Sequence, residues 1–72
     1  MRVKYDRETD ILLLETSPQP IAYAEEMGSI IVHFTEDGKP VLLEILDASD
    51  FLTQAAKAAL TAKAGEFVEI AV

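Results

Sequence analysis

The side chains of this chain that could do chemistry are one histidine and a few closely spaced carboxylates. Glu44 and Asp47 bracket the end of an apolar segment, and Asp50 follows one helical turn later. Paired carboxylates can carry out acid–base chemistry or hold Mg²⁺. Asp47, however, has the position and residue type of a helix N-cap, and caps are much commoner than catalytic carboxylates. We therefore favour a structural role for these residues.

The segment Asp6-x-Glu8-x-Asp10 has the spacing with which a calcium-binding loop begins. Such a loop needs glycine at its sixth position and a bidentate glutamate at its twelfth. Ile11 and Ser17 occupy those two positions, so both the turn geometry and the number of ligands fail. The segment is instead typical of a solvated hairpin turn.

His33 is the only histidine and cysteine is absent, so one copy of the chain cannot build a multi-histidine or thiolate metal site. Ser17, Ser29 and Ser49 lack a G-x-S-x-G elbow, and isolated glycines cannot form a phosphate-binding loop. We predict a protein that is not an enzyme and that has no cofactor and no tightly bound metal.

Composition narrows the class of protein further. The 72 residues include 13 acidic and 6 basic side chains, and the net charge of −7 argues against a nucleic-acid-binding surface. Half of the residues are hydrophobic, which suits one folded domain. The first ten residues do not resemble a signal peptide, and no apolar run approaches the ~20 residues of a membrane span. We expect a single cytoplasmic domain over residues 1–72 that binds neither nucleic acid nor membrane.

The period of the apolar residues predicts the elements that position these side chains. Period-two alternation predicts strands at residues 3–5, 11–16, 21–24, 29–35 and 41–46. Residues 48–64 are rich in good helix formers, which predicts a helix capped by Asp47 or Ser49. We predict an α+β domain, a small antiparallel β-meander of four to five strands with one helix packed on one face. Residues 66–72 alternate again and could add a short C-terminal strand.

Alternation also divides the predicted sheet into two faces. The face that we expect the helix to cover, called the inner face below, carries Val3, Tyr5, Leu12, Leu14, Ile30, Val32, Phe34, Val41, Leu43 and Ile45. The alanine-rich side of the helix should let it approach this face closely. We expect Phe51, Leu52 and Leu60 to be the main anchors of the helix.

The opposite face, called the outer face below, is predicted to be apolar as well. A monomer's sheet normally has one polar face, and contiguous exposed apolar patches usually mark interfaces. We therefore predict a homodimer. Its candidate interface residues are Ile11, Leu13, Ile31, His33, Leu42 and Leu46, with Glu15 and Glu44 nearby. Residues 66–72, or a different partner, are alternative covers for this face.

The segments VKYDRETDILLLETS and AEEMGSIIVHFTEDGKPVLLEILDAS, in this order, resemble the DUF2283 family of small uncharacterised prokaryotic proteins. The resemblance covers roughly residues 2–49. Members are usually aromatic in the second strand and carry glycine in the fifth, where this chain has Leu13-Leu14 and Leu42-Leu43. The resemblance implies a small β-sheet followed by a helix, and it implies no activity.

Two classes of function remain. We favour an acidic interaction module that self-associates and binds a basic protein, one version being an antitoxin-like inhibitor of a small basic partner. The resemblance adds that such genes sometimes lie beside small toxin-like genes. The alternative is an enzyme or a small-ligand or metal-binding protein, with a site at a dimer seam that uses Glu44, Asp47 or His33.

Overall fold

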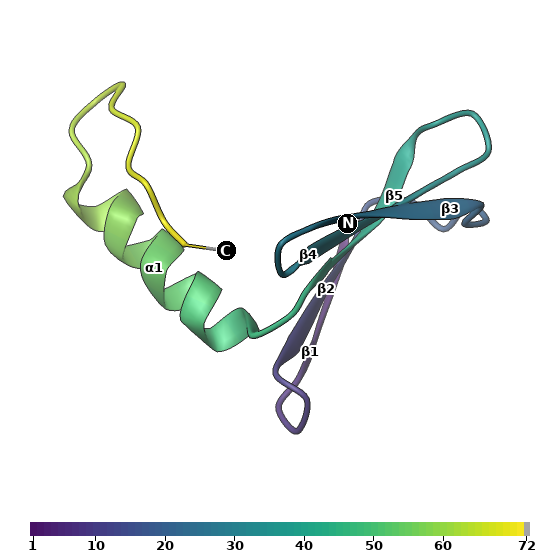
Figure 1. Cartoon of the computed structure of the whole chain (residues 1–72), viewed down its shortest axis with the longest axis horizontal. Coiled ribbons are helices and arrows are strands. Elements are labelled where there is room, and N and C mark those ends of the chain that lie inside the picture. The colour runs from purple at the N-terminus through teal and green to yellow at the C-terminus, as the bar shows by residue number, and fades with distance from the viewer. Residues whose placement is uncertain (72) are drawn as a thin grey trace.

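The computed structural model describes residues 1–71, which form five strands followed by one helix (Figure 1). The elements are β1 (Arg2–Asp6), β2 (Ile11–Glu15), β3 (Tyr23–Met27), β4 (Ile30–Phe34), β5 (Pro40–Ile45) and α1 (Ala48–Thr61). All neighbouring strands pair antiparallel in one open sheet. The predicted α+β class, an antiparallel sheet with one helix, is confirmed.

The strands lie in the order β1-β2-β5-β4-β3, which differs from the simple meander that the sequence predicts. β3, β4 and β5 do pair in succession, but β3 lies at the far edge instead of beside β2. The connection at residues 16–22 contains two prolines, which remove hydrogen-bond donors and prevent a tight hairpin between β2 and β3. β5 consequently takes the place next to β2, at the centre of the sheet.

The register confirms the predicted division of the sheet into two faces, except at Val41, which an irregularity opposite His33 and Phe34 leaves without a directly opposed residue. Leu12 lies opposite Tyr5 on β1 and opposite Ile45 on β5. Ile45 in turn lies opposite Ile30 on β4. Directly opposed residues of antiparallel strands project to the same face, so this row belongs to the inner face. The alternate rows, such as the one through Leu13, form the outer face.

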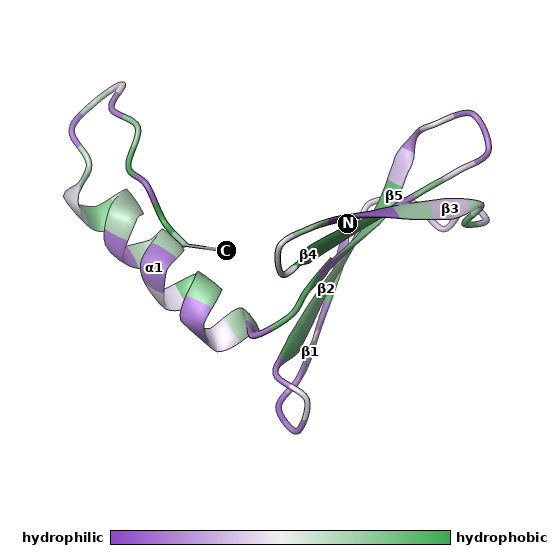
Figure 2. Ribbon diagram, in the orientation of Figure 1, coloured by the Kyte–Doolittle hydropathy of each residue, from purple (hydrophilic) through white to green (hydrophobic). Residues whose placement is uncertain are grey.

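The core cluster of the chain is small and lies at the end of the inner face where α1 begins, whereas Val41, 2% exposed, is buried apart from it. Its buried members are Leu12, Ile45 and Ala48, and its half-buried members are Leu14, Ile30 and Phe51. In Figure 2 the central strands are coloured as hydrophobic, whereas α1 alternates between hydrophobic and hydrophilic. The contact between sheet and helix is therefore confined to the first turn of α1.

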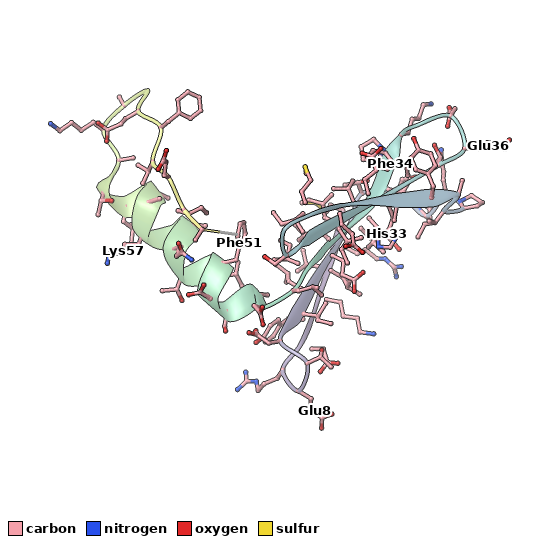
Figure 3. All side chains as sticks on the ribbon, viewed as in Figure 1. Glu8, His33, Phe34, Glu36, Phe51 and Lys57 are labelled. Carbon is pink, nitrogen blue, oxygen red and sulfur yellow. The ribbon has the colours of Figure 1, made fainter. Side chains whose placement is uncertain are left out.

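Beyond that turn, α1 points away from the sheet instead of lying along the inner face (Figure 1). Phe51 reaches the core as predicted, and in Figure 3 it lies on the side of α1 that faces the sheet. Leu52 is exposed, and Leu60 is 87% exposed. The prediction that these two leucines anchor the helix on its own sheet is wrong, because the helix axis diverges from the sheet.

The segment after α1 turns back along the helix and does not join the sheet. Gln54 binds the backbone of Ala71 twice: its Oε1 accepts the N–H at 3.0 Å and its Nε2 donates to the carbonyl at 3.3 Å. Residues 66–71 form no strand. The closing strand is therefore absent over residues 66–71, and residue 72 lies outside the described part of the chain.

Candidate functional site

His33 and Glu44 form a pair of neighbouring acid–base side chains on the outer face. His33 Nε2 on β4 lies 3.2 Å from Glu44 Oε1 on β5, and both side chains are half-buried. The register places Leu13 and Ile31 on either side of Glu44. Asp47 does not join the pair, and residues 1–71 contain no group of three or more acidic, histidine or cysteine side chains that could hold a metal ion.

The predicted interface residues are mostly brought together. Leu13 lies on the outer face of β2, Ile31 and His33 on that of β4, and Leu42 on that of β5; Ile11 lies in line with Leu13 at the start of β2. All five are half-buried. Leu46 lies past the end of β5 and does not join them. Its N–H donates to the Ser29 carbonyl at 2.8 Å, and the residue borders a hollow that Phe51 also lines. The register therefore brings five of the six predicted residues to one face, and their role as an interface stays a prediction.

Charged side chains interleave with the apolar ones on the outer face. Arg2 Nε lies 2.7 Å from Glu15 Oε1, and Arg2 Nη2 lies 3.0 Å from Oε2. The hydrogen bonds from Arg2 lower the pKa of Glu15, and the same carboxylate raises the pKa of Arg2. A hollow of about 430 Å³ lies beside this ion pair, bordered by Lys4, Leu13 and Leu42 as well. The outer face is thus a mixed surface, less apolar than the sequence predicts.

The inner face carries the large apolar side chains that the strands leave exposed. Val3 and Met27, on the two edge strands, are each 61% exposed, and Tyr5 and Tyr23 are exposed too. The register pairs each of them with an inner-face residue of the neighbouring strand. Tyr23 also stacks on Phe34, with ring centroids 5.1 Å apart. The sequence predicts the third strand at residues 21–24 and does not assign Tyr23 and Met27 to this face, because the adjacent Glu25 and Glu26 interrupt the alternation of apolar and polar residues; the strand spans Tyr23–Met27.

All five strands lie in the segment of the chain that matches a known sequence family. The chain matches the family described as "Protein of unknown function (DUF2283)" over residues 2–49. The chain belongs to the DUF2283 family. The predicted family and its extent are thereby confirmed, and the DUF2283 segment ends within the first turn of α1. Searches among curated proteins and among solved structures found no match. Among residues 1–71, no helix is long and apolar enough to cross a membrane.

Within the DUF2283 segment, Asp10 fastens the start of α1 to the sheet. Its Oδ1 accepts the Ser49 N–H at 2.9 Å, its Oδ2 accepts the Ser49 hydroxyl at 2.7 Å, and its carbonyl accepts the Ala48 N–H at 2.9 Å. Tyr5 also donates its hydroxyl to Oδ1 at 2.7 Å. The bonds from Tyr5 and Ser49 lower the pKa of Asp10, and the Asp10 carboxylate raises the pKa of Tyr5.

The prediction that Asp47 caps α1 with its side chain is wrong. Asp47 occupies the N-cap position, but its backbone is left-handed, with φ 50°, and its side chain makes no capping hydrogen bond. Asp10 supplies the oxygen atoms instead, from the turn between β1 and β2. Ser49, the other predicted cap, lies inside the helix as the residue that Asp10 binds.

The part of α1 beyond the DUF2283 segment presents an apolar stripe to solvent. The stripe consists of Leu52, Ala56, Ala59 and Leu60, all of them exposed. Their spacing of four, three and one residues places them on one side of a helix. Lys57 lies on another side, pointing away from the sheet in Figure 3. Two apolar surfaces therefore belong to the same chain: this helix stripe and the part of the inner face beyond the first turn of α1.

Proposed function

We propose that this DUF2283 chain is a protein-interaction module that self-associates and has no catalytic activity of its own. The observation that carries the proposal is the surplus of exposed surface. The chain exposes 5505 Å², whereas a compact monomer of this mass exposes about 4,400 Å². Its radius of gyration is 13.7 Å, against about 11 Å for a compact domain of this length.

The surplus has the size of a protein–protein interface. It amounts to on the order of 1,000 Å² per chain, and a standard interface buries about 800 Å² on each partner. The exposed residues Val3, Met27 and Leu60 give this surplus an apolar character. Burial of such side chains is the main favourable contribution to association. We therefore expect this exposed apolar surface to bind a second protein.

The surroundings of His33 also favour binding over catalysis. An acid–base pair becomes catalytic when a nucleophile or a polarising group faces the same substrate position. Here the pair with Glu44 is flanked by Leu13 and Ile31 on the same face. A small-ligand site at a dimer seam remains the alternative, and thermal stabilisation by a metabolite or a metal ion would support it.

The decisive measurement is the mass of the protein in solution. We expect light scattering to give twice the monomer mass of 7.9 kDa at protein concentrations of about 10–100 µM, because a dimer of modest affinity dissociates near the micromolar range. A monomer mass over this whole range would refute self-association. The sequence-based interface on the outer face stays a prediction, and dissociation of the dimer in Leu13→Glu would support it.

A basic protein is the second candidate partner, and the charge of the edge strand β3 favours it. Glu25 and Glu26 are adjacent and exposed on that strand, and the chain carries a net charge of −7. Such a partner should be captured at low salt and lost at high salt, because screening weakens surface charge attraction. Replacing both glutamates by lysine should abolish capture, and capture that withstands both changes would exclude this candidate.

A further inference from the structure

We propose that, in the dimer, α1 of each chain packs its apolar stripe against the inner face of the partner's sheet. The stripe consists of Leu52, Ala56, Ala59 and Leu60. This inference rests on the self-association proposed above and specifies its geometry. The occupant of the inner face is thus a second copy of the chain, and the exchange is reciprocal.

One chain contains both halves of a helix-on-sheet contact that it does not make by itself. α+β domains are stable because an apolar helix side covers an apolar sheet face. Here the inner face leaves Val3 and Met27 61% exposed, and the helix stripe leaves Leu60 87% exposed. The two surfaces are complementary in chemistry, since both are apolar and the alanines of the stripe allow close approach to a flat sheet.

Two features hold α1 away from the sheet of its own chain. Asp10 binds Ser49 and Ala48 at the start of the helix and thereby fixes the direction in which the helix leaves. The returning segment that ends at Ala71 occupies the side of the helix facing the sheet (Figure 1), where Gln54 holds it with two hydrogen bonds. Closing the helix onto its own sheet would have to displace that segment, whereas docking on a partner leaves it in place.

The dimensions of the two surfaces match. α1 has 14 residues, which gives a length of about 21 Å. The five strands of the sheet, at about 4.8 Å between neighbours, span about 19 Å. A helix laid across the strands therefore covers the inner face from one edge strand to the other. Two such contacts related by a twofold axis have the self-complementary form that a closed dimer requires.

Charge favours a helix over a second sheet as the occupant of the inner face. Residues 1–49 contain four basic and ten acidic side chains, a balance of −6, whereas residues 50–64 contain two lysines and one aspartate, a balance of +1. Packing two inner faces against each other would oppose two acidic sheets, and Glu25 lies on that face by its register with Val32. Exchanged helices instead oppose the acidic sheet with α1, whose 14 residues contain one aspartate and one lysine and so carry no net charge.

Disulfide cross-linking between two single-cysteine variants tests this geometry, because the natural chain has no cysteine. Leu60→Cys is mixed with a second, mass-tagged variant that carries its cysteine on an edge strand. Val3→Cys and Met27→Cys place the thiol on the inner face, and their sequence neighbours Lys4→Cys and Glu26→Cys place it on the outer face. All of these residues are exposed, so we expect the variants to fold.

We expect oxidation to join Leu60→Cys to at least one of the two inner-face variants and to neither outer-face variant. We also expect Leu60→Glu to weaken the dimer at least about tenfold, because a charge would then face an apolar surface. The neighbouring variant Thr61→Glu, on the polar side of α1, should leave the dimer constant unchanged within about a factor of two.

The outcomes separate this inference from the proposed function. A monomer mass for the unmodified chain at all concentrations would refute both. A dimer that cross-links through the outer-face cysteines, or only between two Leu60→Cys chains, would leave self-association standing and overturn the exchange of helices. A dimer that withstands Leu60→Glu as well as Thr61→Glu would overturn it too. An inner-face cross-link together with the loss of the dimer in Leu60→Glu alone would support it.

Discussion

The substitution Ile45→Ala probes the small core where the sheet meets α1. Ile45 is 3% exposed, lies between Leu12 on β2 and Ile30 on β4, and packs in one cluster with Ala48. The change removes three carbon atoms, which at about 0.8 kcal/mol for each buried methylene is a transfer loss of about 2.4 kcal/mol. Neighbours on three elements prevent full collapse of the cavity, so we expect a total loss of about 3 kcal/mol.

Such a loss is large for this chain. A domain of 72 residues has a free energy of unfolding of about 4–11 kcal/mol, so Ile45→Ala should remove about a quarter or more of it. Urea-induced unfolding followed by circular dichroism measures the difference. Both proteins must be compared at one protein concentration, because dimerisation makes apparent stability depend on concentration.

Ile21→Ala is the matched control, because it makes the same chemical change at a residue that is 51% exposed and lies outside the strands. We expect it to cost less than about 1 kcal/mol. Equal losses for Ile45→Ala and Ile21→Ala would mean that the cluster around Ala48 does not stabilise the fold. The intermediate variant Ile45→Val should cost about 0.5–1.5 kcal/mol if the cavity argument is correct.

Three further predictions concern the turns and the helix. The pKa of Asp10 in the folded chain lies below its ordinary value of 3.8, so the hydrogen bonds of Asp10 stabilise the fold at any pH above 3.8. This contribution is lost as the pH falls through the lower folded-state pKa. The decrease in melting temperature at acid pH should therefore be smaller in Asp10→Asn. Gly38→Ala should cost about 1 kcal/mol or more in urea unfolding, because its φ of 84° is a conformation that residues with a Cβ rarely adopt. An unchanged midpoint would contradict this. Gln54→Ala should release the returning segment, visible as faster amide exchange at Ala71, with Thr53→Ala as the control that leaves it slow.

The class of fold and the two faces of the sheet could be predicted because side chains alternate along a strand. Leu12 and Ile45 fall on one face by counting alone, and the register confirms it. The order of strands could not be predicted by pairing successive segments. The useful signal was the composition of the strands: ILLLE and PVLLEI each carry one charged residue and lie inside the sheet, whereas RVKYD carries three and YAEEM two, and these form its edges.

The candidate site could be predicted less completely. Alternation brings Leu13, Ile31 and Leu42 to one face correctly, but it does not show that Arg2 and Glu15 form an ion pair among them. The cap of α1 was missed because its oxygen atoms come from Asp10, far away in the sequence. A helical wheel identifies an apolar stripe, but it contains no information about whether the sheet that covers the stripe belongs to the same chain.

The position of β5 at the centre of the sheet has a consequence for synthesis of the chain. Among the five described strands, β5 joins the β1–β2 hairpin to the β3–β4 hairpin, yet it is the last of the five to be synthesised. Until then the nascent chain holds two separate hairpins, and an isolated hairpin is marginally stable in water. We therefore expect the complete sheet to form only after translation of residues 40–45, when β5 can close the long loops between the hairpins. We expect a chain that terminates before Pro40 to form no stable sheet and to be degraded as an unfolded peptide.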